Sequence, residues 1–152
     1  MRLTLAAVGR ARPGPETDLF RQYARRLTPA LTLREVEERR PLPTDRLKAR
    51  EAELLLGCVP AGAIAVALDE HGRQLESRAF AARIQAWRDG GAPELVLLIG
   101  GADGHGAAVR ERADLLLSLG AMTWPHMLVR ALVAEQLYRA QAILAGHPYH
   151  RD

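Results

Sequence analysis

The chain has 152 residues, of which 48% are hydrophobic and 26% are charged, and its formal net charge is +3. This length and composition are typical of one folded domain and argue against extended disorder. No apolar run approaches the roughly 20 residues needed to cross a bilayer, and the first residues lack the features of a secretory signal. We therefore expect a cytoplasmic protein.

Two residue types narrow the chemistry further. Cys58 is the only cysteine, which excludes an internal disulfide and a cluster of thiolate metal ligands. Lys48 is the only lysine, so nearly all the positive charge is arginine. This preference has two explanations, a compositional bias of the whole chain or phosphate recognition by guanidinium groups. The net charge is compatible with nucleic acid but does not require it.

The first half of the chain predicts three strands separated by two helices. The strands are the alternating runs at 2–8 and 31–37 and the continuous apolar run at 63–68. A first helix opens at Glu16 or Thr17 and has apolar residues at helical spacing. A second helix follows, with Thr44 as its N-cap and with its end before Pro60.

The second half continues the alternation. Ser77 is expected to cap a helix over 78–87, and a strand at 94–99 runs directly into glycines. A short helical piece at 107–113 precedes another apolar run at 115–122. Strands alternating with helices predict a single α/β domain, with a mostly parallel sheet flanked by helices.

The last predicted helix, within 123–146, points to a second copy of the chain. Pro125 fits a first helical position and Gly146 the position just past the helix end. Its clear polar positions do not gather on one face: Arg130, Glu135, Gln136, Arg139 and Gln141. A helix apolar nearly all round needs cover on several sides, and with only one sheet available we expect a homodimer through this region. The alternative is that alanines inflate the apolar count.

Ligand chemistry is expected in the loops that follow the strands. Parallel sheets bind ligands at the carboxyl ends of their strands, and three runs end in suitable segments, "ALDEHG", "LIGGADGHG" and "LSLGAMTWPH". The glycine-rich second segment matches neither a P-loop nor a dinucleotide fingerprint. It is either a mononucleotide cradle or a tight strand-to-helix turn.

The closing "HPYHRD" gathers side chains used in proton transfer and phosphate binding. His147 and His150 lack an accompanying metal-binding pattern, so no metal is expected. His71 and His105 lie in glycine-flanked loops and are expected to be solvated. His126 is either a site residue or a local cap.

The run "LLIGGADG", with the later "LSLGAMTWPHMLVRALVAEQLYRAQAILAGHPYHRD", resembles the RlmH family of SPOUT methyltransferases. The similarity extends to "LTLAAVGR" and "AVALDEHG" and is densest over 95–151. The resemblance implies S-adenosylmethionine-dependent methylation of N3 of a pseudouridine in bacterial 23S ribosomal RNA. It also implies a C-terminal trefoil knot, which periodicity alone does not predict.

In this family the cofactor lies on the knot loops and is held largely by backbone groups. The matching positions are Leu68, Gly100, Leu119, Gly120, Ala121, Met122, Thr123 and Trp124. At Ala102, Asp103 and Trp124 this chain differs from many relatives, but the glycines are intact. Asp103 and Glu70 are further candidates to position the cofactor or the base.

The tail provides the candidate catalytic residues. Tyr149, His150 and Arg151 offer a hydrogen bond to the base, proton acceptance and attraction for phosphate, with proton handling assigned to either His150 or Tyr149. Arg130 and Arg139 are expected to bind RNA or bridge subunits, and Arg139 to pair with Glu135.

Two other functions stay open: a non-catalytic module that binds the ribosome or RNA, and a methyltransferase that acts on transfer RNA. A dimer would join two basic faces and bring one subunit's tail to the partner's cofactor pocket. Ribosomal RNA, or the assembled ribosome, would then be recognised by shape.

Overall fold

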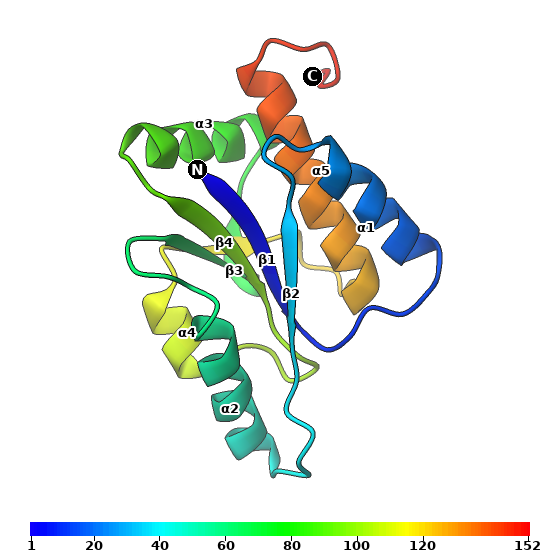
Figure 1. Cartoon of the computed structure of the whole chain (residues 1–152), viewed down its shortest axis with the longest axis vertical. Coiled ribbons are helices and arrows are strands. Elements are labelled where there is room, and N and C mark those ends of the chain that lie inside the picture. The colour runs from blue at the N-terminus through cyan, green and yellow to red at the C-terminus, as the bar shows by residue number, and fades with distance from the viewer.

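The computed structural model describes residues 1–152 and consists of five strands that alternate with five helices (Figure 1). The strands are β1 (Arg2–Val8), β2 (Thr32–Val36), β3 (Ile64–Gln74), β4 (Glu94–Ile99) and β5 (Leu115–Ser118). The helices are α1 (Pro15–Arg26), α2 (Thr44–Leu56), α3 (Ser77–Asp89), α4 (Ala107–Arg112) and α5 (His126–Leu144). The predicted α/β class is confirmed.

All five strands join one sheet in the order β2-β1-β4-β3-β5, and every pairing is parallel. Val66 of β3, for example, pairs with Leu97 of β4 on one side and with Leu115 of β5 on the other. Because β4, β3 and β5 are neighbours, their carboxyl ends meet at one edge of the sheet. The predicted parallel sheet is therefore confirmed, and it brings the three proposed loops together.

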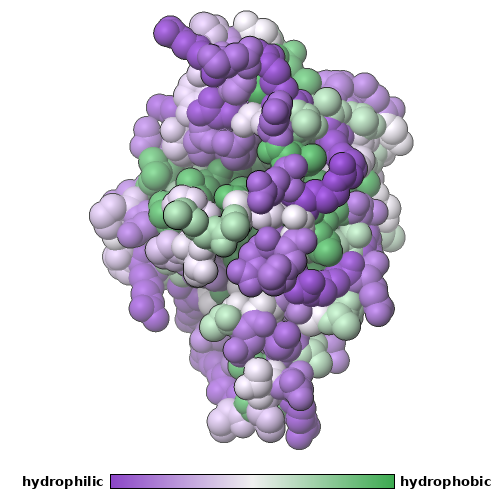
Figure 2. Space-filling model, turned by 180° about the vertical axis from the view of Figure 1, so that it is seen from behind, coloured by the Kyte–Doolittle hydropathy of each residue, from purple (hydrophilic) through white to green (hydrophobic).

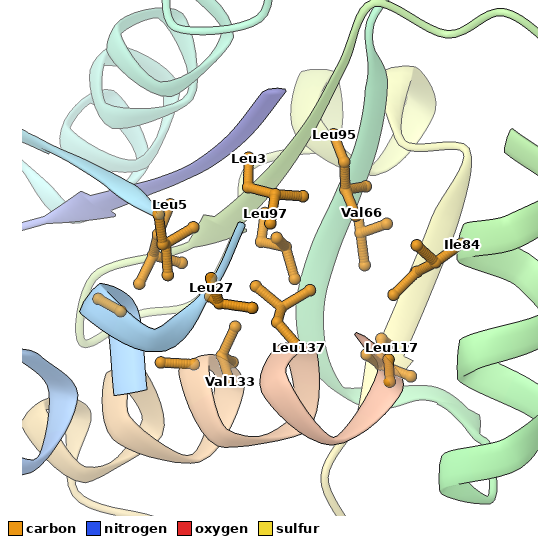
Figure 3. Close-up of a cluster of buried hydrophobic side chains, with 14 of the residues drawn as sticks. Leu3, Leu5, Leu27, Val66, Ile84, Leu95, Leu97, Leu117, Val133 and Leu137 are labelled. Atoms are coloured by element: carbon orange, nitrogen blue, oxygen red, sulfur yellow. The ribbon is translucent and has the colours of Figure 1, made fainter. Parts of the chain in front are cut away.

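Helices cover both faces of the sheet, as the strand pattern requires. Leu95 and Leu97 face the larger core with α1, α3 and α5, whereas Val96 and Leu98 face a smaller core with α2 and α4. Successive strand residues point to opposite faces, so a strand such as β4, which is apolar from Leu95 to Ile99, fills two cores at once. Figure 3 shows the larger core, where side chains from the strands meet Val133 and Leu137 of α5.

Helix α5 is covered by more than the sheet. Helices α1 and α3 also pack against it, and tyrosine and aliphatic side chains from the three helices contact the larger core. The premise that a lone sheet covers this helix was wrong, because two helices share its layer. The homodimer stays a prediction.

Strand β3 runs further than the predicted end at residue 68. Leu117 of β5 pairs with both Leu68 and Arg73, and the four residues between them leave the register. At Gly72, a Cβ atom would lie 2.6 Å from the carbonyl carbon and oxygen of Leu116, so only glycine fits this crossing. Residues 69–72 leave the ladder, as the predicted loop requires, but the predicted strand end at residue 68 was wrong, because Arg73 and Gln74 pair with β5 again.

Helix boundaries follow the predictions within a few residues, but the predicted caps do not. Thr44 and Ser77 are the first helical residues of α2 and α3, and neither helix has a side-chain cap. Pro125 was predicted as the first helical residue of α5, but it is the N-cap, and the helix begins at His126. Gly146 follows the end of α5 with a φ of 69°, which confirms its predicted place.

The surface is largely hydrophilic, and hydrophobic residues gather in the middle of the face seen in Figure 2. Three large hydrophobic side chains are exposed, Leu19, Met122 and Trp124. No helix combines the length and the apolar character that crossing a membrane demands.

Candidate functional site

A cavity of about 350 Å³ opens where β5 ends, between the sheet and helices α3 and α5. Its volume falls in the range of about 300–1,000 Å³ that is usual for small-molecule sites. Its walls are mainly apolar with a few polar groups, and the lining residues are Gln74, Leu75, Ser77, Phe80, Leu97, Leu117, Ser118, Leu119, Gly120, Trp124, Leu132, Val133 and Gln136.

Part of the predicted cofactor site lines this cavity. Leu119, Gly120 and Trp124 are among its walls. Leu68 is half-buried against the larger core, and Gly100 packs against the ring of His105. The three remaining predicted residues are exposed and outside the lining: Ala121, Met122 and Thr123.

The turn that leads from β5 into the loop is held by Ser118. Its Oγ accepts a hydrogen bond from the Gly120 amide at 3.1 Å. The same Oγ lies within hydrogen-bond distance of the carbonyl oxygens of Gly120 and Glu70, at 3.1 and 3.2 Å. Gly120 has a φ of 116°, in the left-handed region that favours glycine. The first part of the predicted cofactor loop therefore has a defined backbone.

Sequence reasoning missed the opposite wall of the cavity. Gln74, Leu75 and Ser77 connect β3 to α3, and Gln136 projects from α5. Ser77 donates a hydrogen bond to Gln136 Oε1 at 2.8 Å, which joins the two helices. The hydropathy of "RQLES" resembles an ordinary exposed loop, so no local signal predicts this wall.

A continuous set of hydrogen bonds connects the cavity with the tail. The Nε2 of Gln136 donates to Glu135 Oε2 at 2.9 Å, and the Tyr149 hydroxyl donates to Glu135 Oε1 at 3.0 Å. Arg139 Nε donates to the same Oε1 at 3.0 Å. Glu135 is thus the junction, and sequence reasoning had recognised it only as a partner of Arg139.

The predicted catalytic residue Tyr149 is packed among other aromatic groups. Its hydroxyl lies 3.0 Å from that of Tyr23, and its ring meets Tyr138 edge-on with centroids 4.8 Å apart. Burial, with the hydrogen bonds to Tyr23 and Glu135, raises the pKa of Tyr149. In this arrangement Tyr149 keeps its proton and serves as a hydrogen-bond donor.

His150, the second predicted catalytic residue, is held at both ring nitrogens. Its Nδ1 lies 3.0 Å from Arg139 Nη1, and its Nε2 lies 3.2 Å from the Asp152 carboxylate. A guanidinium only donates, so Nδ1 is the acceptor and Nε2 carries the hydrogen. Asp152 in turn pairs with Arg78 at 2.7 Å, which ties the tail to the first turn of α3.

The arginines differ in their surroundings. Arg151 is exposed, as a phosphate contact requires. The predicted pairing of Arg139 with Glu135 is confirmed. Arg130, in contrast, is only 2% exposed and pairs with Glu35 at 2.7 Å within the same chain. The expectation that Arg130 binds RNA or a partner subunit was wrong, because its charge is already used inside the protein.

His105 lies beneath the glycine loop, between β4 and α4. It is 4% exposed, and its Nε2 lies 3.2 Å from the Leu98 carbonyl oxygen. Burial lowers the pKa of His105, so the ring is neutral near pH 7. The expectation of a solvated side chain was wrong for His105, whereas His71 is exposed. No set of three or more histidine, cysteine or acidic side chains is arranged to hold a metal ion.

These features define a class of protein. It is an α/β domain with a small-molecule cavity at the edge of a parallel sheet, and a C-terminal tail with tyrosine and histidine side chains lies beside the cavity. The sequence matches the family described as "Predicted SPOUT methyltransferase" over residues 1–150. The chain therefore belongs to the SPOUT methyltransferase family. Methyltransferases of this family use S-adenosylmethionine.

Individual relatives agree with this membership. The chain is 68% identical over 151 residues to "Ribosomal RNA large subunit methyltransferase H" from Paramagnetospirillum magneticum, covering 99% of both chains. It resembles the structure of a probable methylase family protein from Haemophilus influenzae with a TM-score of 0.58 at 9% identity, covering 99% of this chain and 70% of that one. The second comparison shows a shared fold.

A further solved structure is the SpoU methyltransferase AviRb from Streptomyces viridochromogenes in complex with AdoMet. The TM-score is 0.48 at 16% identity, and the match covers 92% of this chain but only 58% of that longer one.

Proposed function

We propose that this protein methylates N3 of a pseudouridine in 23S ribosomal RNA on assembled ribosomes, with S-adenosylmethionine as the methyl donor. The observation that carries the proposal is the 68% identity, over nearly the full length of both chains, to a protein named as a large-subunit ribosomal RNA methyltransferase. The proposal gives the cavity and the adjoining tail a shared purpose.

The cavity suits the proposed donor. Leu119, Leu132 and Val133 provide apolar surface for a flat heterocycle, and the backbone of Gly120 is accessible without a side chain in the way. Ser77 and Gln136 place polar groups at the helix side. We assign donor binding to this cavity together with the predicted residues Leu68, Gly100 and Leu119 to Trp124.

When bound, S-adenosylmethionine supplies an electrophilic methyl group on sulfur. The N3 nitrogen of the acceptor must lose its proton as the new nitrogen–carbon bond forms, so the protein has to orient the base and provide a proton acceptor. We assign base orientation to the Tyr149 hydroxyl, phosphate binding to Arg151, and proton acceptance to His150, whose Nδ1 must exchange its contact with Arg139 for the base proton. The raised pKa of Tyr149 favours a donor role for that side chain.

We further propose a homodimer whose interface includes the C-terminal helix region. Met122 and Trp124, in the loop before α5, are 76% and 41% exposed. Large apolar side chains at the surface, close to a functional loop, are typical of protein interfaces. A dimer would also enlarge the basic surface available to ribosomal RNA and bring a tail to the partner's cavity.

The trefoil knot predicted from the family resemblance remains our expectation for the C-terminal part. The return of β3 onto β5 supports it. After the excursion from Leu68, the chain meets the backbone of Leu116 so closely at Gly72 that no side chain fits between them. A close backbone contact of this kind is compatible with one segment threaded past the other.

The test is transfer of a tritiated methyl group to ribosomes that lack the modification. We expect the full-length protein to label 23S RNA, and a variant truncated after Gly146 to bind S-adenosylmethionine but transfer no methyl group. The truncation removes Tyr149, His150 and Arg151 but no residue that lines the cavity.

Three other results would contradict the proposal. Equal turnover by the truncated protein would remove the tail from the mechanism. Labelling of transfer RNA instead of ribosomes would identify the other substrate. An unchanged melting temperature on addition of S-adenosylmethionine would favour a non-catalytic RNA-binding module, because a ligand of the native state raises stability.

A further inference from the structure

A buried arginine joins three segments near the end of the predicted cofactor loop. Arg130 Nη1 donates to Glu35 Oε2 at 2.7 Å, and its Nη2 donates to the carbonyl oxygen of Gly9 at 3.1 Å. The same Nη2 lies 3.3 Å from His126 Nε2. Glu35 also accepts a hydrogen bond from the Ala11 amide. A charge buried this fully is costly unless partners replace its hydration. Here the partners of the two terminal nitrogens come from the residue after β1, from β2 and from α5, and Nε has no partner.

The contacts of Arg130 lie where the loop of residues 119–124 enters α5, so they restrain the end of that loop. His126 is the first residue of α5 and follows the loop after Pro125. A guanidinium has no acceptor, so His126 Nε2 accepts from Arg130 and the proton of the neutral ring is on Nδ1. Arg130 therefore holds the first turn of α5 against the carboxyl ends of β1 and β2.

The loop is thus fixed at both ends. Ser118 fixes the entry through its hydrogen bond with the Gly120 amide. Arg130 and His126 fix the exit, where the chain turns into α5. Between these points lie six of the residues that we assign to donor binding, Leu119 to Trp124, and Trp124 is in the cavity wall. Backbone groups bind a ligand well only when the chain that carries them is already ordered.

We propose that Arg130 is a positioning residue for the methyl-donor site, because it fixes the exit of the loop that runs from Leu119 to Trp124. This inference rests on the proposed function of the cavity. Arg130 does not line the cavity and has almost no exposed surface. Its effect reaches the ligand through the first turn of α5 and not by contact.

The principal variant is Arg130→Lys, which keeps the charge. A lysine ammonium is a point charge on a flexible stem and does not reproduce the planar fork that spans Glu35, Gly9 and His126. We expect the dissociation constant for S-adenosylmethionine, measured by calorimetry, to rise about tenfold. Hydrogen exchange should become faster in the peptide that covers residues 119–125, with the central strands unchanged.

The matched control is Glu94→Gln at the amino edge of the sheet. Glu94, like Arg130, is a buried charged residue in an ion pair: it lies 2.9 Å from Arg2 and accepts a hydrogen bond from Thr4. Its loss should lower the melting temperature with no change in the dissociation constant for S-adenosylmethionine. The comparison separates a general loss of stability from a specific effect on the loop.

A second variant covers the case in which Arg130→Lys does not fold. His126→Ala removes the acceptor at the loop exit and leaves Arg130 with Glu35 and Gly9. We expect a rise of about threefold in the dissociation constant, because only one of the three contacts is lost. An unchanged constant in every folded variant of these two residues, or an equal rise in Glu94→Gln, would overturn the inference.

The same measurements keep the two proposals apart. Wild-type protein that binds S-adenosylmethionine, together with an Arg130→Lys variant of equal affinity, contradicts the positioning role alone. Wild-type protein that does not bind S-adenosylmethionine contradicts the proposed function, and with it the positioning role.

Discussion

Tyr149 is the residue at which the tail and α5 are most closely joined. Its hydroxyl contacts both Glu135 and Tyr23. Replacement by phenylalanine keeps the ring packing and removes these hydrogen bonds. We expect Tyr149→Phe to lower kcat for methyl transfer about tenfold to a hundredfold with little change in KM for S-adenosylmethionine, because the cavity is untouched. Steady-state kinetics on unmodified ribosomes measures both constants.

Tyr138 provides the matched control for this variant. Its ring packs against Tyr149 and Tyr23, with centroids 4.8 and 6.0 Å away, but its hydroxyl takes no part in the Glu135 network. Tyr138→Phe should retain nearly full activity. Both variants keep their rings, so equal losses would contradict a specific role for the hydrogen bonds of the Tyr149 hydroxyl.

Two histidines make the stability of the protein depend on pH. Burial is the main cause that lowers the pKa of both His105 and His126 below the usual 6.5. Unfolding therefore takes up protons when the pH lies between the folded and unfolded pKa values. The free energy of unfolding should be greatest above pH 6.5 and fall as the pH drops toward the lowered pKa values, by up to about 1.4 kcal/mol per pH unit for each group.

The contribution of His105 can be isolated by substitution. In His105→Leu, unfolding no longer takes up a proton at this position. The unfolding free energy should therefore fall less steeply between pH 7 and pH 5 than it does in wild type. Urea denaturation at a series of pH values measures the slope independently of the absolute stability. His71→Asn is the control, since His71 is exposed. The same slope in His105→Leu and wild type would show that another group is responsible.

Among the elements, β3 has the most demanding geometry. Substitution at Gly72 forces a Cβ atom into the backbone of Leu116, 2.6 Å away. We expect Gly72→Ala to lower the free energy of unfolding by about 3 kcal/mol, because backbone cannot move aside as the end of a side chain can. Denaturant unfolding is the measurement. Gly57→Ala, at a helix end with ordinary φ, should cost less than about 1 kcal/mol, and equal losses would refute this account of Gly72.

Most elements were predictable from the sequence, because burial imposes the period of the strand or helix on the residues themselves. The apolar run of β4, Leu95 to Ile99, is an example, with all five residues buried. The caps were less predictable. Ser77 looked like a cap but uses its hydroxyl to bind Gln136, a tertiary contact that no local rule contains. The polar end of β3 was missed because backbone pairing leaves no trace in hydropathy.

The candidate site was predictable only in part. The loop that begins at Leu119 follows a buried strand, and its place at the sheet edge follows from the parallel arrangement. The order of strands, which brings β4, β3 and β5 side by side, is set by long-range packing. Gln136 and Ser77 come from segments 59 residues apart. The assignment of a cofactor to these loops came from the resemblance to a family.

At the scale of the whole molecule, the main prediction concerns assembly. Met122 is 76% exposed beside the predicted interface. We expect Met122→Glu to weaken a homodimer by about tenfold or more, because it places a charge where apolar cover is needed. Sedimentation velocity over a range of concentrations gives the dissociation constant. Leu19→Glu, on α1, is the control, and a wild-type protein that sediments as a monomer at all concentrations would contradict the dimer.

The double pairing of Leu117 bears on how the ligand site operates. Both walls of the cavity begin at the same pair of strands. Arg73 and Gln74 of β3 pair with Leu117 and Ser118 of β5 just before the two strands diverge. The cavity is therefore rigid on its sheet side, and it changes shape only where α5 or the exposed residues of the loop move. Calorimetry should therefore measure only a small entropy loss from ordering of the protein when S-adenosylmethionine binds. The conformational changes of the catalytic cycle should then occur in the tail.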